Sequence, residues 1–90
     1  MSRRLSILVV DDVAYLRTML RDFVVMLGHD VIEAVDGADA VAQFQKHQPS
    51  LILMDLIMPK LDGVEATKAI RALCGDRWVP IIMISADDDQ

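Results

Sequence analysis

Short apolar runs alternate with stretches of helical periodicity, and this alternation constrains the fold more than any other feature of the sequence. Three runs are rich in branched aliphatic residues and have the length of buried strands: residues 5–10, 51–54 and 79–84. A shorter and more polar strand is predicted over Asp30–Ala34. A strand that is apolar on both sides needs cover on both sides, which is the environment of a parallel sheet in an α/β protein.

Between these runs, apolar residues recur at the spacing of a helix. The sequence predicts helices over residues 13–27, 37–47 and 63–73, with Asp36 and Asp62 as N-caps of the second and third. Strand and helix thus alternate three times before a final strand, which implies parallel strands joined by right-handed crossovers. On the first helix we expect one buried face, made of Leu16, Leu20, Phe23, Val24 and Leu27.

Composition narrows the class of protein. The chain of 90 residues is 53% hydrophobic and 26% charged, which suits one small folded domain and excludes intrinsic disorder. No apolar run approaches the ~18 residues of a membrane span. The net charge of −5 argues against nucleic-acid binding by this segment. A single cysteine, Cys74, and no signal-peptide pattern after Arg3 and Arg4 suggest a cytoplasmic protein.

Acidic side chains stand where two of the apolar runs end. Asp11 and Asp12 close the first strand, and Asp55 closes the third. In a doubly wound sheet, ligands bind beyond the carboxyl ends of the strands, where the winding reverses. If the first and third strands are neighbours, about 4.8 Å apart, the three carboxylates come within reach of one ion. Ligands that are all oxygen favour a hard cation, and few protein ligands favour Mg²⁺ over Ca²⁺.

A cation there would relieve the repulsion among the carboxylates and orient an incoming phosphoryl group, and a carboxylate could then form an acyl phosphate. Structural roles stay open beside this interpretation. Asp12 is also placed to be the N-cap of the first helix, and Asp11 to be a solvated loop acid. As a structural acid, Asp55 would need a basic partner, and Lys60 is the one nearby in sequence.

Four short motifs stand in order along the chain. They are LVVDD at residues 8–12, LMDLIMP at 53–59, KLDG at 60–63 and PIIMISA at 80–86. Together they resemble the receiver domain of bacterial two-component response regulators, of the chemotaxis-regulator type. The resemblance implies a flavodoxin-like α/β fold, a doubly wound parallel sheet with four strands in the order 2-1-3-4 and three helices.

The resemblance also implies a role for the acids. Asp55 would be the phosphoacceptor, which takes its phosphoryl group from a histidine kinase or a phosphotransfer protein. Asp12 would ligate Mg²⁺ directly and Asp11 through water, while Asp55 and the backbone carbonyl of Ile57 would complete the protein's ligands.

Four further residues match family positions around the acids. Ser85 would supply the hydroxyl that turns toward the phosphoryl group, and Ala86 the small residue that leaves room for it. Pro59 and Gly63 would shape the loop below the site. Local roles stay open here too, because a serine at a strand end bonds nearby backbone, and proline and glycine form ordinary turns.

The sequence also departs from the family, which has five strands and five helices. The fourth helix, fifth strand and fifth helix have no counterpart within residues 1–90, so we expect a single receiver domain that is incomplete at its C-terminus. The family's lysine on the fifth strand goes with them. The strand expected at residues 79–84 would then have an open, apolar edge, which predicts self-association through that strand.

We therefore expect a receiver that is phosphorylated on Asp55 and acts as a signalling switch, not as a dedicated enzyme. The alternative is a phosphorylation-independent module that uses the same fold for binding or dimerisation. A third possibility, a metal-dependent phosphatase or another enzyme, would have no general base beyond the acid cluster itself. Arg17 and Arg21, four residues apart, are predicted to form a solvated basic face, which the resemblance makes a candidate for docking the kinase.

Overall fold

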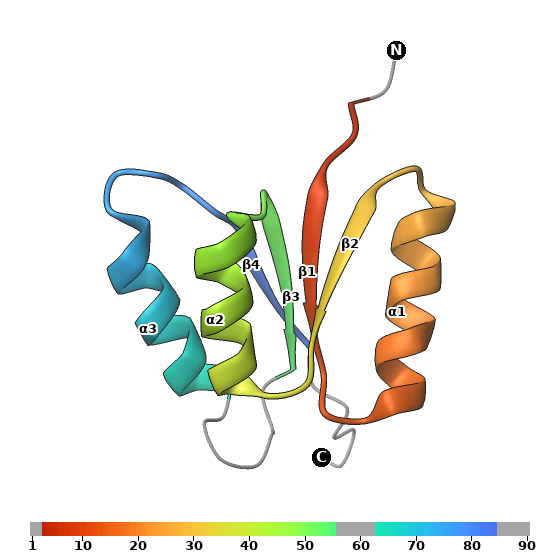
Figure 1. Cartoon of the computed structure of the whole chain (residues 1–90), viewed down its shortest axis with the longest axis horizontal. Coiled ribbons are helices and arrows are strands. Elements are labelled where there is room, and N and C mark those ends of the chain that lie inside the picture. Colours follow the sequence, from red (N-terminus) through yellow and green to blue (C-terminus); the bar gives the residue numbers. More distant parts are fainter. Residues whose placement is uncertain (1–2, 56–62, 85–90) are drawn as a thin grey trace.

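The computed structural model describes residues 3–55 and 63–84 of the chain. Strands and helices alternate along them, and all strands pair in parallel in the order β2-β1-β3-β4 (Figure 1). This confirms the predicted doubly wound, flavodoxin-like α/β fold and its strand order. The elements are β1 (Ser6–Val10), α1 (Ala14–Met26), β2 (Asp30–Ala34), α2 (Gly37–His47), β3 (Leu51–Asp55), α3 (Gly63–Cys74) and β4 (Ile81–Ile84).

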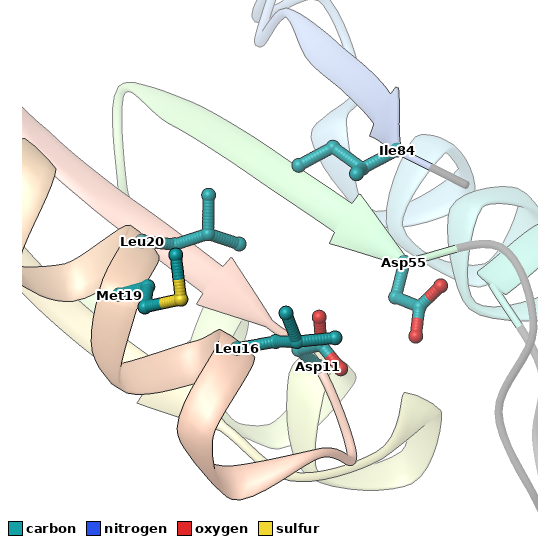
Figure 2. A pocket seen from close by; sticks show the side chains of 6 residues that line it. All are labelled: Asp11, Leu16, Met19, Leu20, Asp55 and Ile84. Carbon is teal, nitrogen blue, oxygen red and sulfur yellow. The ribbon is translucent and has the colours of Figure 1, made fainter. Parts of the chain in front are cut away.

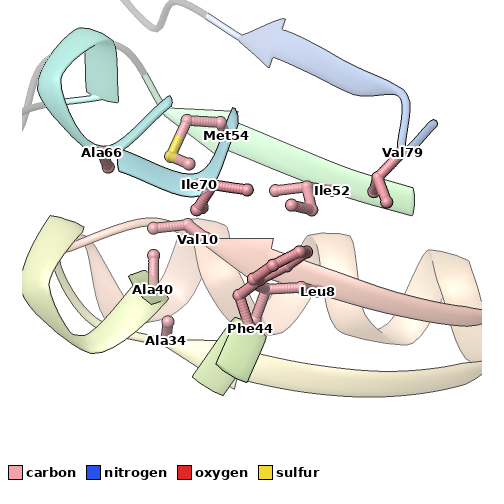
Figure 3. Packing of buried hydrophobic residues seen from close by; sticks show 10 residues of the cluster. All are labelled: Leu8, Val10, Ala34, Ala40, Phe44, Ile52, Met54, Ala66, Ile70 and Val79. Carbon is pink, nitrogen blue, oxygen red and sulfur yellow. The ribbon is translucent and has the colours of Figure 1, made fainter. Parts of the chain in front are cut away.

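The larger core lies between the sheet and the pair of helices α2 and α3 (Figures 1 and 3). Phe44 of α2 and Ile70 of α3 are fully buried there against strand residues such as Leu8 and Ile52. Because successive side chains of a strand point to opposite faces, alternate residues of β1 enter this core and the others face α1. This explains why the apolar runs have no polar side.

Among the described helices, α1 is the one that covers the other face of the sheet, and it lies over β1 and β2 (Figure 1). Among its described residues Val24 is buried, and Leu20 packs beside it against the sheet. The prediction of a five-residue buried face was wrong at two positions, because Phe23 is 53% exposed and Leu27 is 56% exposed. A lone helix on a sheet buries only the narrow stripe that touches the strands, and neither residue lies within it.

Helix α2 begins as the sequence predicts. Asp36 is its N-cap and accepts a hydrogen bond from the N–H of Asp39 at 2.8 Å. The Asp39 carboxylate in turn accepts from the N–H of Val35 at 3.0 Å. The first of these bonds satisfies a backbone donor that the first turn of a helix leaves without a partner, and the second ties that turn to the residue before the cap. Asp62, the predicted cap of α3, lies outside the described residues.

The last strand is shorter than predicted, since β4 begins at Ile81 and not at residue 79. Pro80 has no N–H to donate to a ladder, although its carbonyl accepts from the N–H of Ile52 at 3.0 Å. Val79 is nevertheless buried in the larger core, so the first residue of the predicted apolar run packs against the core although it does not pair as a strand. None of the described helices is long and apolar enough to cross a membrane.

Candidate functional site

The topology brings the acids of two strands to one edge of the sheet. β1 and β3 are parallel neighbours, with Val10 beside Met54, so Asp11 and Asp55 each come next at the same end. From β1 the chain winds to β2 on one side and later to β3 on the other, which makes this edge the switch point of the winding.

Three carboxylates converge there. Asp11, Asp12 and Asp55 each offer one oxygen, and these three oxygens all lie within 4.8 Å of one another. Asp11 and Asp55 are buried, with 3% and 5% of their surface exposed, whereas Asp12 is exposed. Two oxygens on opposite sides of one Mg²⁺ lie about 4.2 Å apart, so adjustments below an ångström would let all three oxygens contact one ion. The cluster thus has the chemistry and the dimensions of a site for a hard cation.

Asp11 is buried and bonded to the backbone around it, so the alternative of a solvated loop acid was wrong. Its N–H donates to the carbonyl of Ala34 at 3.2 Å, and its Oδ1 accepts from the N–H of Val13 at 2.9 Å. The first bond extends the β1–β2 ladder by one residue, and the second forms a tight turn into α1. One Asp11 oxygen is therefore engaged in shaping the loop that carries the site.

Asp12 does not cap α1, so the alternative of a purely structural cap was wrong. The N-cap is Val13, and α1 has no hydrogen bond from a capping side chain. The N–H of Val13 bonds Asp11, and no side chain caps α1, so the helix start makes no use of the Asp12 carboxylate. Asp12 instead turns an exposed carboxylate toward the two buried ones.

A pocket of about 170 Å³ opens beside the acids on the α1 face of the sheet (Figure 2). Asp11 and Asp55 lie at one end of it. Its remaining wall is apolar and comes from α1 and β4: Leu16, Met19, Leu20 and Ile84. The buried acids therefore have an apolar wall on one side and the exposed Asp12 on another.

The comparisons with known proteins decide the family. A family model described as the response regulator receiver domain matches residues 7–90. The chain belongs to this family. The resemblance drawn from the four sequence motifs is thus confirmed, and the chain is a signalling module of the two-component type.

Relatives of this receiver include chemotaxis regulators. The chemotaxis protein CheY of Bacillus subtilis is 44% identical over 85 residues, which are 93% of this chain and 69% of that protein. The structure of Vibrio cholerae CheY4 aligns with a TM-score of 0.88 and 31% identity, over 97% of this chain and 72% of that one. A chain of the CheX–CheY–BeF3–Mg²⁺ complex from Borrelia burgdorferi aligns with a TM-score of 0.85 and 29% identity, over 96% and 65% of the two chains.

Other relatives are longer. The receiver spans 35% of the alkaline phosphatase synthesis regulator PhoP of Bacillus subtilis, and about a third of the other transcriptional regulators that it matches. The receiver is thus similar both to proteins of which it covers about 70% and to about one third of larger ones.

Several predicted site residues are not placed by the structure. Ile57, Pro59, Ser85 and Ala86 lie outside the described residues, as does Lys60, so their roles stay predictions. Gly63 is described: it is the buried first residue of α3, and its carbonyl accepts a hydrogen bond from the Thr67 hydroxyl at 2.7 Å.

Arg17 is a site residue whose position the sequence did not predict. Its side chain is only 17% exposed, so the predicted solvated basic face was wrong for this residue. It bonds both the carbonyl of Asp11 and the carboxylate of Glu33 on β2. A signal was present in the sequence, because Glu33 stands between the apolar residues Ile32 and Ala34 of β2, and an acid that is buried even in part calls for a basic partner.

Arg21, one turn further along α1, behaves differently. It is 40% exposed and forms hydrogen bonds of 2.9 and 3.1 Å with Asp22, while its Nη1 lies 3.7 Å from Oε2 of Glu33. The hydrogen bond with Asp22, and to a smaller degree the charge of Glu33, raise the pKa of the Arg21 guanidinium. It therefore fits the predicted solvated face.

Proposed function

We propose that Asp55 accepts a phosphoryl group from a histidine kinase or a phosphotransfer protein in a Mg²⁺-dependent reaction, and that this switches a cytoplasmic signalling pathway. The observation that carries the proposal is the convergence of three carboxylate oxygens, from Asp11, Asp12 and Asp55, at the switch point of the sheet. The presence of both Mg²⁺ and BeF3 in the related Borrelia complex supports it.

Each acid has a part in this proposal. Asp11, Asp12 and Asp55, with the backbone carbonyl of Ile57, would hold Mg²⁺. Bound there, Mg²⁺ offsets the negative charge that the carboxylates and the phosphoryl group bring together. An oxygen of Asp55 would attack phosphorus in line with the bond to the donor's nitrogen, which breaks as the acyl phosphate forms. The end of β3 keeps that oxygen in place, since Asp55 is 95% buried in a paired strand.

The remaining matched residues would act around the phosphoryl group. Ser85 would bind one of its oxygens, Ala86 would leave space for it, and Pro59 and Gly63 would shape the loop between Asp55 and α3. In this role the receiver is the substrate and the switch, and a kinase or another phosphodonor supplies the chemical energy. The expectation of a single domain over residues 1–90 that lacks further family elements stays a prediction.

Intact-mass measurement with acetyl phosphate tests the proposal directly. The full chain should gain one phosphate in the presence of Mg²⁺ and none in the presence of a chelator. Asp55→Asn should abolish the adduct, and Asp12→Asn should slow its formation. Asp22→Asn is the matched control, because it removes an exposed aspartate of α1 far from the cluster and should label like the native chain. An adduct that persists in Asp55→Asn would refute the assignment.

A second candidate function, self-association without phosphorylation, is favoured by the edge of the sheet. Among the described residues β4 pairs only with β3, and its Ile82 is 50% exposed and Met83 42% exposed. An apolar strand with an open edge can pair with another copy. If the chain takes up no phosphate and associates at micromolar concentration through residues 79–84, this second function replaces the first.

A further inference from the structure

Arg17 joins three parts of the molecule through one guanidinium group. It projects from α1, and its Nε donates to Oε1 of Glu33 on β2 at 3.1 Å. Its Nη1 donates to the backbone carbonyl of Asp11, at the end of β1, at 2.9 Å. The side chains of Arg17 and Glu33 are 17% and 35% exposed. The planar guanidinium is well suited to this task, because its donors point in fixed directions and can hold two oxygens at once.

The carbonyl that Arg17 holds belongs to the peptide that joins the two acids. The peptide group is planar, so the position of the Asp11 carbonyl also sets the direction in which Asp12 leaves the strand. On its other side, Asp11 is held by the bond from its N–H to Ala34, and its carboxylate holds the N–H of Val13. Of the bonds that fix the turn over residues 11–13, the one from Arg17 holds the peptide between the acids.

We propose that Arg17, itself held by Glu33, is a positioning residue for the cation site. It fixes the Asp11–Asp12 peptide and thereby sets how these two carboxylates face Asp55. This inference rests on the proposed Mg²⁺ site. Through it β2 takes part in the site although β2 contributes no ligand. Glu33 orients the guanidinium of Arg17, and the guanidinium orients the Asp11–Asp12 peptide.

Arg21 provides a matched control on the same helix. It lies one turn from Arg17, carries the same charge and faces the same Glu33, with Nη1 3.7 Å from Oε2. Its hydrogen bonds go to Asp22 and not to the turn over residues 11–13. Arg21→Gln therefore removes an equal charge near Glu33 and leaves the Asp11 carbonyl with its donor.

The experiment is a titration of the full chain with Mg²⁺, followed by the amide resonances of residues 11–13 and 55. It reports the dissociation constant among folded molecules and needs no phosphoryl transfer. Arg17→Gln should weaken Mg²⁺ binding about tenfold. This is the lower end of the loss of metal affinity that follows when a residue that orients a metal ligand is removed. Arg21→Gln should change the constant less than twofold. The dissociation constant of Glu33→Gln should lie between those of Arg17→Gln and Arg21→Gln, because the amide oxygen of the new glutamine can still accept a hydrogen bond from Arg17.

A second readout separates positioning from general stability. In the metal-free chain, hydrogen exchange at the Val13 amide should speed up in Arg17→Gln relative to amides in the middle of β1, because the turn loosens while the strand stays paired. Arg17→Lys tests the geometry in a variant that keeps the charge. A lysine presents its donors from one nitrogen and lacks the fixed, separate positions of Nε and Nη1 that bond Glu33 and the Asp11 carbonyl, so Mg²⁺ binding should again be weaker than in the native chain.

The outcomes are distinct. If Arg17→Gln and Arg17→Lys bind Mg²⁺ as the native chain does, or if Arg21→Gln weakens binding as much as Arg17→Gln, the positioning role is overturned and the proposed function stands. If the native chain shows no saturable change with Mg²⁺, the proposed metal site itself fails, and the positioning role fails with it.

Discussion

The two faces of the sheet are lined by similar aliphatic residues but are closed to very different degrees. On the face that carries α2 and α3, residues from three strands and both helices are fully buried (Figure 3). On the face that carries α1, the described buried hydrophobic residues are Ile7, Val9 and Val24. Ile82 lies on this face beside Leu53 and is half exposed. Strand composition alone therefore does not bury a face; the number of helices on it does.

The candidate site lies on the border of the less closed face. Asp11 and Asp55 share their pocket with apolar residues of α1 and β4 that pack against the sheet only in part (Figure 2). The strands that end in these acids are thus packed against α2 and α3 on one face, while a pocket opens beside the acids on the α1 face. This difference suits a site that must keep its carboxylates in place and still admit a phosphodonor.

The largest effect is expected in the closed face. Phe44→Ala should lower the free energy of unfolding by about 3–5 kcal/mol, because it leaves a cavity between α2 and the sheet. For a small domain this is a large part of the total stability. Urea denaturation followed by circular dichroism measures the change. A loss below about 1 kcal/mol would show that this face is less tightly packed than its burial indicates.

A smaller effect is expected under α1. Val24→Ala should cost about 1.5 kcal/mol, from two buried methyl groups at about 0.8 kcal/mol each. Val25→Ala is the matched control, because the next residue is 54% exposed and its change should stay within about 0.5 kcal/mol. Equal losses in the two variants, measured in the same urea experiment, would contradict the orientation of α1 on the sheet.

The helix starts on the two faces should also differ. Asp36→Ala removes the side-chain cap of α2 and should cost about 1 kcal/mol. Asp12→Ala should cost no stability in the absence of Mg²⁺, because α1 uses no side-chain cap and the change relieves repulsion within the acid cluster. Thermal unfolding in a chelating buffer compares the two. A clear loss of thermal stability in Asp12→Ala would show that Asp12 does cap α1, against the structure.

The smallest effect on stability, with the clearest effect on association, is expected at the open edge. Ile82→Thr keeps a β-branched residue that suits a strand and removes apolar surface that is already half exposed. Sedimentation velocity at micromolar concentrations should show association in the native chain and less in this variant. Val35→Thr, which changes a residue 47% exposed just after β2, should associate like the native chain. Equal sedimentation of all three as monomers would remove the proposed self-association.

Much of the fold could be predicted because the pattern is local and repeated. Each apolar run became a strand and each helical period a helix, with ends that moved by no more than about two residues. The start of β4 moved by two residues, from the predicted residue 79 to Ile81, because Pro80 lacks the N–H that the ladder of β4 would need. The convergence of Asp11, Asp12 and Asp55 was also predictable, since acids at the ends of neighbouring parallel strands meet at one edge.

What each acid does locally could not be predicted in the same way. Asp11 and Asp12 are adjacent in sequence, and either could have bonded the start of α1. The direction in which the chain leaves β1 decides between them, so that Asp11 bonds the N–H of Val13 and Asp12 stays free of the helix. That direction depends in turn on Arg17, six residues away, and on Glu33, which belongs to another strand.

The sequence by itself determined the order of the elements, the doubly wound sheet and the edge at which the acids meet, because hydrophobic periodicity and chain direction are properties of neighbours along the chain. The tertiary structure alone decided which side chains of α1 are buried and which acid shapes the turn. It also decided that the Arg17 side chain is largely buried and bonds the Asp11 carbonyl. These outcomes depend on how many helices share a face and on which groups of distant elements come within hydrogen-bonding distance, and the hydrophobic periodicity of the chain encodes neither.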